Sequence, residues 1–386
     1  MSSPLPDAVP LSEVRRVLVT KLRHHGDVLL ASPVFTALKS AAPHAGIDAL
    51  VYADTAPMLE GHPAIDRIHT IDRGWKRQGV VRRWSAERAL ARALASRGYD
   101  LLVHLTEHPR GLALARRLAP RWSVTSERAA GRSASWLWRR TYTHFYRLPR
   151  ATERPMAEQN LDALRRIGIE PAGSDRALVM VPGAEAERRA DALLRERGLA
   201  RGAYVQFHPG SRWTFKCWPA DRCAELIARV VAGGLPVVLT GAPDPRERAI
   251  AVAILGALAP DTAARVVDLG GALTLRELAA VTARARAFVG VDSAPMHIAA
   301  AVGTPAVALF GPTSEIAWGP WRVEHRIVAS AHPCRPCGQD GCGGGKVSEC
   351  LTTLPVERVH AALAELLESA GTAVAPADGP PTGVAP

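Results

Sequence analysis

The stretch Lys21-Leu22-Arg23-His24-His25-Gly26-Asp27-Val28-Leu29-Leu30 joins a strand pattern at residues 17–20 to a helical pattern at residues 33–42. Gly26 and Asp27 therefore lie in a tight turn at the carboxyl end of the first strand, the edge at which open α/β sheets bind ligands. A glycine there lets the backbone turn and approach a ligand closely. An aspartate there can accept a proton or cap the helix. The stretch predicts an α/β protein with an active site at this turn.

Strand patterns alternate with helical patterns along most of the chain. The predicted strands cover residues 17–20, 47–51, 68–71 and 101–105, then 204–208, 237–240, 266–269, 287–291 and 306–310. The predicted helices lie near 33–42, 55–61, 82–97 and 156–168, then at 219–231, 245–257, 274–284, 294–302 and 356–368. This alternation predicts parallel sheets with helices on both faces. Two such halves with a cleft between them form the expected architecture.

The predicted boundaries follow the changes in composition. They separate an N-terminal extension (1–14), two α/β units (15–175 and 176–355), a C-terminal helix (356–370) and a tail (371–386). We expect the tail, which is rich in Pro, Gly and Ala, to be disordered. Residues 139–155 are interpreted as a mobile loop or a short helix, and residues 170–185 as a linker.

The net charge of +11 is concentrated in the first half of the chain. Residues 110–154 hold 11 arginines against Glu127 and Glu153, and residues 73–92 hold seven basic residues against Glu87. Such a surface indicates an anionic partner, either nucleic acid, acidic lipid or a phosphorylated substrate. The alternative is a solvated arginine-rich face. Tryptophans between the arginines suit a membrane–water interface or an ordinary half-buried helix.

Several classes of protein are disfavoured by missing signals. No apolar run reaches 18 residues, so we expect no transmembrane helix. The first ten residues lack a basic region followed by an apolar core, so we expect a cytoplasmic protein without a secretory signal. The motifs GxxxxGK[ST], HExxH and GxSxG are absent, as is GxGxxG after the first strand. P-loop hydrolysis, zinc proteolysis, serine hydrolysis and simple dehydrogenation are therefore poorly supported.

The second half carries ligand-type turns at successive strand ends. In the first, His208-Pro209-Gly210-Ser211-Arg212 is followed by Lys216. Backbone N–H groups, the Ser211 hydroxyl and the Lys216 charge suit a phosphate or diphosphate, although a plain loop with a surface lysine is the alternative. In the second, Thr240-Gly241-Ala242-Pro243-Asp244 suits a base or a ribose edge.

The third turn, Val291-Asp292-Ser293-Ala294-Pro295-Met296-His297, is the strongest of these signals. Ser293 can cap the helix that follows. We expect the free N–H groups of Ser293, Ala294 and Met296 to point into the crevice, where the helix dipole favours phosphate. As an alternative, Asp292 only caps the helix and His297 only packs in the core. With the turn at 310–313, four successive strand ends indicate a nucleotide-binding unit.

Four cysteines form a compact cluster, Cys334-x2-Cys337-x4-Cys342-x7-Cys350. They suit a structural zinc ion, or disulfides in an oxidising compartment. The spacing is not that of a standard zinc ribbon, and a cytoplasmic location disfavours disulfides. We therefore favour unliganded thiols that pack a loop over a structural zinc site.

Taken together, these residues resemble the lipopolysaccharide heptosyltransferases of glycosyltransferase family 9. The stretch 21–30 is most similar to the branch called heptosyltransferase III. So are Phe215-Lys216-Cys217-Trp218, the turn at 291–297 and the cysteine segment that leads to Glu349-Cys350-Leu351-Thr352. The resemblance runs from about residue 15 to residue 367.

The resemblance implies a GT-B fold, in which two Rossmann-like domains face each other across a cleft. The first domain would bind the acceptor and the second the nucleotide sugar. The implied reaction moves heptose from ADP-heptose to an inner-core heptose of nascent lipopolysaccharide, with inversion and without a metal or other cofactor. The expected partners are this acceptor and the acidic cytoplasmic face of the inner membrane, with no nucleic acid, and the expected state is a monomer.

The resemblance also implies roles for single residues. Asp27 matches the general base, and Lys216 matches the lysine that neutralises the departing diphosphate. The expected donor-binding residues are Ser211, Lys216, Gly241, Asp244, Asp292, Ser293, Ala294 and His297. The expected acceptor-binding residues are His24, His25, Arg132, Arg139 and Arg140. Several relatives carry a glutamate for the ribose hydroxyls where this chain has Ala242-Pro243-Asp244, so Asp244 is expected to substitute for it.

Three alternatives stay open. A nucleotide-sugar epimerase of the same fold would also use a carboxylate in the cleft, but it would turn over the donor without an acceptor. A related family 9 transferase would use another sugar or acceptor. A nucleic-acid-binding protein would show strongly salt-dependent affinity for DNA, but the balanced charge of the second half argues against it. His24 and His25 either contact the acceptor or only stabilise their turn.

Overall fold

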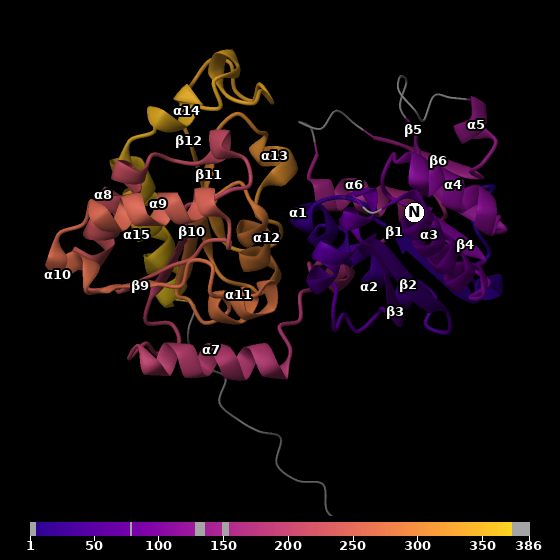
Figure 1. Cartoon of the computed structure of the whole chain (residues 1–386), viewed down its shortest axis with the longest axis horizontal. Coiled ribbons are helices and arrows are strands. Elements are labelled where there is room, and N and C mark those ends of the chain that lie inside the picture. The colour runs from indigo at the N-terminus through magenta and orange to yellow at the C-terminus, as the bar shows by residue number, and fades with distance from the viewer. Residues whose placement is uncertain (1–4, 78, 128–135, 149–153, 373–386) are drawn as a thin grey trace, which may run out of the picture.

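The computed structural model describes residues 5–77, 79–127, 136–148 and 154–372, which form two α/β lobes (Figure 1). The first lobe contains the strands β1 (Arg16–Thr20), β2 (Gly46–Tyr52), β3 (Arg67–Ile71), β4 (Leu101–His104), β5 (Trp122–Glu127) and β6 (His144–Arg147). Its helices are α1 (His25–Leu29), α2 (Ser32–Ala41), α3 (Val80–Ala95), α4 (Pro109–Leu118), α5 (Trp136–Arg139) and α6 (Met156–Arg165). Its 3-10 turns are η1 (Leu11–Glu13), η2 (Ala53–Met58), η3 (Arg73–Arg77) and η5 (Gly173–Arg176).

The second lobe repeats this alternation. Its strands are β7 (Val205–His208), β8 (Val237–Leu239), β9 (Val266–Asp268), β10 (Ala287–Val291), β11 (Ala306–Phe310) and β12 (His325–Ala329). Its longer helices are α7 (Ala184–Glu196), α8 (Ala220–Ala232), α9 (Pro245–Gly256), α11 (Leu275–Thr282), α12 (Ala294–Ala301) and α15 (Val356–Thr372). Its short helical turns are η6 (Thr214–Lys216), α10 (Pro260–Ala263), α13 (Glu315–Trp318), η7 (Cys342–Gly344) and α14 (Glu349–Thr352).

Both sheets are parallel and have the same topology. The strand orders are β3-β2-β1-β4-β5-β6 and β12-β11-β10-β7-β8-β9. Counted from its own first strand, each sheet has the order 3-2-1-4-5-6 of the doubly wound dinucleotide-binding fold. The predicted fold of two Rossmann-like units is therefore confirmed. In this fold ligands bind where the strand order reverses, which is between β1 and β4 in the first sheet and between β7 and β10 in the second.

The strands at these switch points are buried on both faces, as expected for parallel sheets covered by helices. All five residues of β10 and of β11 are buried, and the same holds for all four residues of β4. The core of the first lobe continues into the second, because Leu278, Ala279 and Ile298 join the same apolar cluster as Val28 and Leu59. Helices α1 and α12 pack against each other at this boundary (Figure 1).

Several predictions of local structure differ from the structure. Residues 139–155 were expected to form a loop or short helix, but they contain the strand β6. The helix expected near residues 55–61 is the 3-10 turn η2. The linker expected near residues 170–185 ends where α7 begins, and this helix, which was not predicted, buries Ala186, Ala190 and Leu194 at helical spacing. Helix α15 extends to Thr372, so residues 371 and 372 of the expected tail are helical, while residues 373–386 lie outside the described residues.

The strand β5 also escaped prediction, because its sequence Trp-Ser-Val-Thr-Ser-Glu lacks the expected apolar run although its four central residues are buried. Within the part of the chain that the structure describes, no helix is long and apolar enough to cross a lipid bilayer.

Gly111 in α4 provides a test of the packing in the first lobe. A Cβ atom at this position would overlap Nε2 of His104, a buried side chain of β4. We expect Gly111→Ala to lower the free energy of unfolding by about 1–3 kcal/mol, the usual cost of overpacking a core. The matched control is Gly256→Ala in α9, where a Cβ would meet nothing within 4 Å. Because alanine favours helices, the control should unfold at the same or a higher urea concentration. Equal urea midpoints for the two variants would contradict the tight contact between residue 111 and His104.

Candidate active site

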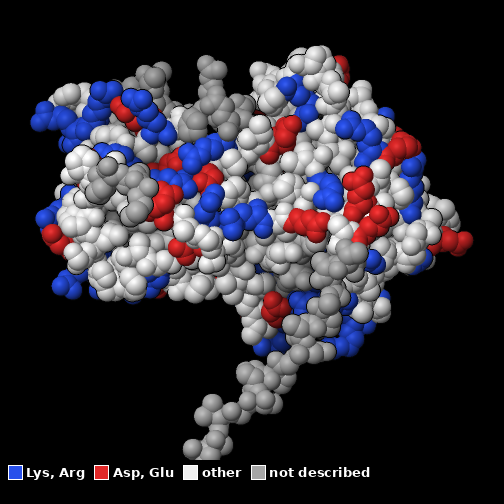
Figure 2. Space-filling model, turned by 180° about the vertical axis from the view of Figure 1, so that it is seen from behind, with Lys and Arg blue, Asp and Glu red and all other residues white. Residues whose placement is uncertain are grey.

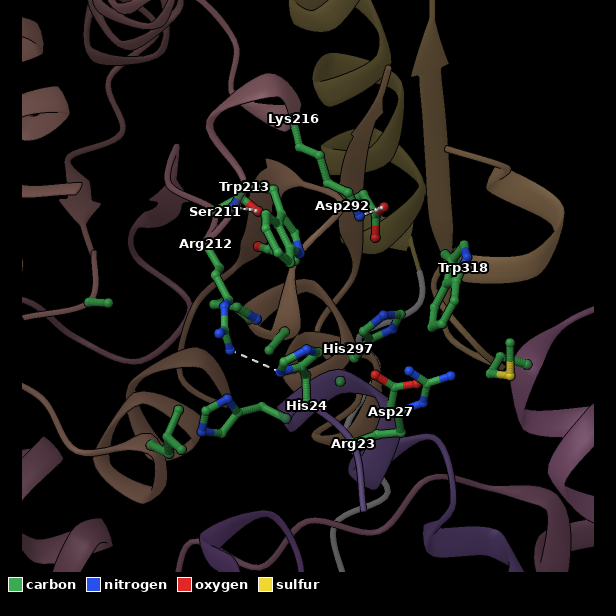
Figure 3. Close-up of a pocket in the computed structure, with 18 of the residues that line it drawn as sticks. Arg23, His24, Asp27, Ser211, Arg212, Trp213, Lys216, Asp292, His297 and Trp318 are labelled. Atoms are coloured by element: carbon green, nitrogen blue, oxygen red, sulfur yellow. Dashed lines mark hydrogen bonds and ion pairs between the residues drawn. The ribbon is translucent and has the colours of Figure 1, made fainter. Parts of the chain in front are cut away.

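A cavity of about 1070 Å³ lies between the two lobes, lined by loops that follow the carboxyl ends of both sheets. The predicted site residues that line it are His24, His25, Asp27, Ser211, Lys216, Gly241, Asp244, Asp292, Ser293, Ala294 and His297. Figure 3 shows Asp27 and His24 on the side of the first lobe, with Lys216 and Asp292 on the opposite side. The turns predicted at separate strand ends thus meet in one site.

Gly26 lies at a close contact between the two lobes in this site. A Cβ atom at residue 26 would lie 2.9 Å from Cδ2 of His297 and 3.8 Å from Cα of Ala294. Gly26 is a helical residue of α1, so this position requires glycine for its lack of a side chain. Asp27 follows in the first turn of α1, where the helix dipole favours a carboxylate.

The two histidines before Gly26 have different partners. His25 Nε2 donates to the backbone oxygen of Asp54 at 2.8 Å and so holds a neighbouring loop of its own lobe. His24 Nδ1 lies 2.9 Å from Nη1 of Arg212, which reaches across the cleft from the second lobe (Figure 3). Burial and the positive charge of Arg212 lower the pKa of His24. His25 therefore stabilises the turn, whereas His24 links the two lobes.

Lys216 is held by an ion pair inside the cleft. Its Nζ donates to Oδ2 of Asp292 at 2.6 Å, and Thr313 Oγ1 donates to the same oxygen at 2.7 Å. The side chains of Lys216 and Asp292 are only 16% and 5% exposed. The loop that carries Lys216 is fixed from behind, because Ser348 Oγ donates to the backbone oxygen of Phe215 at 2.7 Å. The lysine charge therefore points toward the N-terminus of α12.

The N-terminus of α12 differs in two details from the prediction. Ser293 occupies the N-cap position, but its side chain makes no capping hydrogen bond. The Met296 N–H, expected to be free, donates to the backbone oxygen of Ser293 at 3.2 Å. Both expectations were wrong because the Met296 N–H, in the first turn of α12, bonds the backbone of Ser293, and the Ser293 hydroxyl bonds no helix N–H.

Two buried polar atoms at this helix end lack a hydrogen-bond partner among the described residues. They are Ser293 Oγ and His297 Nδ1. Burial lowers the pKa of His297 to about 4, so its ring is neutral at pH 7. Because buried polar groups are nearly always hydrogen-bonded, these atoms favour a polar ligand. The helix dipole and Lys216 favour an anionic one.

Asp244 lines the cavity but also has a local task. Its carboxylate accepts from the Arg246 N–H at 2.9 Å and caps α9.

Glu247, one turn after Asp244, was not predicted and ties two loops of the site together. It accepts from the Ala242 N–H at 2.8 Å and lies against Gly210, where any Cβ would overlap its carboxylate. Although burial acts to raise it, the pKa of Glu247 is lowered, chiefly by the hydrogen bond with His208.

Lys21 is a second residue that the sequence analysis did not single out. Its side chain is buried, and Nζ donates to Asn160 Oδ1 at 2.9 Å and to the Leu105 oxygen at 3.3 Å. Burial lowers the pKa of Lys21 to about 8, an effect opposed by Asp27. Asn160 also donates to the Leu30 oxygen at 2.9 Å. Helix α6 is thereby attached to the turn that carries Asp27.

Of the predicted arginines, Arg139 and Arg140 do not line the cavity. Arg139 pairs with Glu127 at 3.3 Å on the surface, and Arg140 stacks over the exposed ring of Trp136. Arg132 lies outside the described residues. Figure 2 shows basic side chains along the outer edge of the first lobe, at the left of that view, and more acidic side chains over the second lobe.

The four clustered cysteines are free thiols, of which Cys334 and Cys342 are exposed and Cys350 is buried. In the described ranges of the chain, no group of three or more His, Cys, Asp or Glu side chains is placed to hold a metal ion. The cysteine segment instead packs behind the site, since the Gly338 N–H donates to the Pro312 oxygen at 2.8 Å.

Known proteins with similar sequences and folds agree with this geometry. Residues 87–347 match the family model described as glycosyltransferase family 9 (heptosyltransferase). Lipopolysaccharide heptosyltransferase 3 of Escherichia coli is 35% identical over 301 residues, which are 78% of this chain and 84% of the relative. Lipopolysaccharide heptosyltransferase 1 of Pseudomonas aeruginosa is 29% identical over 342 residues, 85% of this chain and 87% of the relative.

Solved structures show the same fold. The family 9 glycosyl transferase from Veillonella parvula superposes with a TM-score of 0.79 at 24% identity, covering 94% of this chain and 99% of that chain. The E. coli ADP-heptose LPS heptosyltransferase II gives 0.72 at 21% identity, covering 92% and 99%. Two Rossmann-like lobes with a cleft between their switch points define the GT-B fold. The chain belongs to glycosyltransferase family 9.

The ion pair of Lys216 can be tested by comparison with an exposed pair. We expect Lys216→Met to lower the free energy of unfolding by about 2 kcal/mol or more, because the buried carboxylate of Asp292 loses its cationic partner. The control is Lys346→Met, which breaks a pair with Asp340 of 2.7 Å in which both side chains are 58% exposed. Such surface pairs contribute at most about 1 kcal/mol. Urea unfolding measures both, and equal losses would contradict the assigned role of burial.

Proposed function

We propose that this protein transfers heptose from ADP-heptose to an inner-core heptose of lipopolysaccharide, with inversion at the anomeric carbon and without a metal ion. The observation that carries the proposal is the position of Asp27 opposite the Lys216–Asp292 pair in one cavity (Figure 3). The proposal is supported by relatives named lipopolysaccharide heptosyltransferase 3, which are 33% and 35% identical over 78% of this chain.

Asp27 is the proposed general base. It would take the proton of the acceptor hydroxyl while that oxygen attacks the oxocarbenium-like anomeric carbon. Positioned general bases typically accelerate such steps by about 10²–10⁴-fold. Attack from the side of the first lobe, with the nucleotide leaving toward the second, gives inversion in a single displacement.

Lys216 and the start of α12 are proposed to stabilise the departing diphosphate. Lys216 supplies the positive charge, and Ser293 and His297 supply polar atoms that have no partner among the described residues. Losing one preorganised donor of this kind typically costs about 10²-fold in rate. We assign Ser211, Gly241, Asp244, Asp292 and Ala294 to the rest of the donor.

The acceptor is proposed to bind on the side of the first lobe, with His24 in contact with it and His25 shaping the turn. Arg139 and Arg140 lie outside the cavity. We therefore assign them to the attraction of acceptor phosphates and acidic lipids at the cytoplasmic face of the inner membrane, where the protein would act as a peripheral monomer.

Transfer from ADP-heptose to lipopolysaccharide that lacks the added heptose tests the reaction, with the product read by mass. We expect the wild type to add one heptose in the presence of a chelator. Asp27→Asn should lower kcat by about 10²–10⁴-fold, because the amide cannot accept the proton. Binding of ADP by this variant, measured by calorimetry, should stay close to wild type and controls for folding.

Three outcomes would count against the proposal. Turnover of the donor without acceptor would identify an epimerase. Transfer that requires a divalent cation would contradict the proposed role of Lys216. Addition of another sugar, or to another acceptor, would leave the family unchanged but exclude the assigned substrates.

The basic surface of the first lobe can be tested separately. Trp84 and Trp136 are 58% and 68% exposed, with Arg88 and Arg140 stacked over their rings. Each arginine near an acidic membrane contributes about 1 kcal/mol. Because two arginines are removed, we expect the double variant Arg139→Gln, Arg140→Gln to bind vesicles of anionic phospholipid about 30-fold less tightly in a sedimentation assay. The matched double variant Arg188→Gln, Arg189→Gln removes two adjacent exposed arginines from α7 and should bind like wild type. Equal losses would indicate a simple effect of net charge.

A further inference from the structure

Arg212 connects the two lobes at the cavity and has no role in the proposed reaction so far. It follows Ser211 in the loop between β7 and η6, and its Nη1 lies 2.9 Å from His24 Nδ1, 188 residues away in the sequence (Figure 3). Its guanidinium also lies 5.5 Å from the ring centre of Trp213. The contact therefore joins the loop that carries Lys216 to the turn that carries Asp27.

The chemistry of this contact determines which nitrogen of His24 carries hydrogen. Arginine has only donors and keeps its proton at any physiological pH. In a hydrogen bond with Arg212, Nδ1 must therefore be the acceptor, and the hydrogen of the neutral ring must lie on Nε2. His24 is the N-cap residue of α1 but makes no side-chain capping bond, so its own helix does not compete for the ring.

The charges around His24 favour the same state. The groups that face it are Arg212, Arg73 and Arg23, which disfavour a second proton, and Asp27, which favours one. His25 differs, because its ring bonds the Asp54 oxygen. Burial is the main cause of its lowered pKa, and the charge of Arg212 has only a small effect on it. The two neighbouring rings thus respond unequally to Arg212.

We propose that Arg212 is a positioning residue that holds His24 in the tautomer with hydrogen on Nε2, so that His24 donates a hydrogen bond to the acceptor beside Asp27. This inference rests on the proposed function, because it requires that the acceptor binds at His24. Since Arg212 belongs to the second lobe, the acceptor side of the site is complete only when the two lobes face each other.

The state of His24 can be measured without any substrate. In full-length protein labelled with ¹⁵N-histidine, the imidazole nitrogen shifts report the tautomer and the pKa, and His24→Asn assigns the signals. We expect the wild type to show hydrogen on Nε2. In Arg212→Met, the tautomers should mix and the pKa of His24 should rise, because a neighbouring positive charge is gone. Arg212→Lys keeps the charge and should retain part of the lowered pKa.

Two controls accompany this measurement. Arg201→Met removes an exposed arginine outside the cavity and should leave His24 unchanged. His25 is an internal control, whose signals should move less than those of His24. An unchanged tautomer and pKa of His24 in Arg212→Met would overturn the inference.

Kinetics of heptose transfer then test whether the Nε2 hydrogen is used. His24→Gln places an amide N–H near the position of Nε2, whereas His24→Asn places an oxygen near Nδ1, where it can still accept from Arg212. We expect kcat/KM for the acceptor to fall about tenfold in His24→Asn and in Arg212→Met, which corresponds to about 1.4 kcal/mol. The loss should be smaller in His24→Gln, and the donor KM should change little in all three.

The order of the two histidine variants separates the possible roles. If His24 only bridges the lobes, Asn will be better tolerated than Gln, and the inference fails. A wild type that transfers no heptose would overturn the proposed function together with the acceptor role of His24. If the wild type transfers heptose normally, but the tautomer and pKa of His24 are unchanged in Arg212→Met, only the role of Arg212 is overturned.

Discussion

The close approach of Gly26 to His297 is the constraint on which the site depends. Helices α1 and α12, one from each lobe, contact each other here, and a single added methyl group would lie 2.9 Å from the imidazole. The apolar cluster that continues from the first lobe into α11 and α12 supports the same arrangement. Asp27 faces Lys216, and Arg212 reaches His24, only because the two backbones meet here without a side chain between them.

Much of the fold could be predicted because parallel strands buried on both faces are apolar throughout. The strands β10 and β11 follow this rule, and the buried parts of β1 and β4 follow it up to their last residues, Thr20 and His104. The strand β5 breaks the rule, since Ser123, Thr125 and Ser126 are buried in it. Helix α7 was overlooked for a different reason: its apolar residues have helical spacing, but they are small and lie among charged residues next to an expected linker.

The site was predicted as far as local sequence allows. Lys216 and Asp292 could be placed together because their turns follow strands of one parallel sheet, and the expected cleft between the two halves added Asp27. Lys21 and Arg212 could not be assigned tasks, because their partners Asn160 and His24 lie 139 and 188 residues away. Glu247 left a weak signal, an acidic residue one turn into the helix after Gly241. The misread Ser293 and Met296 show that a cap is decided by local backbone geometry, which residue type alone does not determine.

The Lys216–Asp292 ion pair has a consequence for the choice between small and large anions. Orthophosphate and the phosphate groups of many metabolites compete for any exposed lysine. A lysine that is already neutralised, and that shares its carboxylate oxygen with Thr313, is a poor trap for such ions. A ligand that displaces Lys216 from Asp292 must make further contacts along the cavity. A long ligand with a sugar, a diphosphate and a nucleoside is therefore favoured over small anions. The Lys216–Asp292 pair therefore weakens the binding of small phosphate-containing molecules relative to that longer ligand.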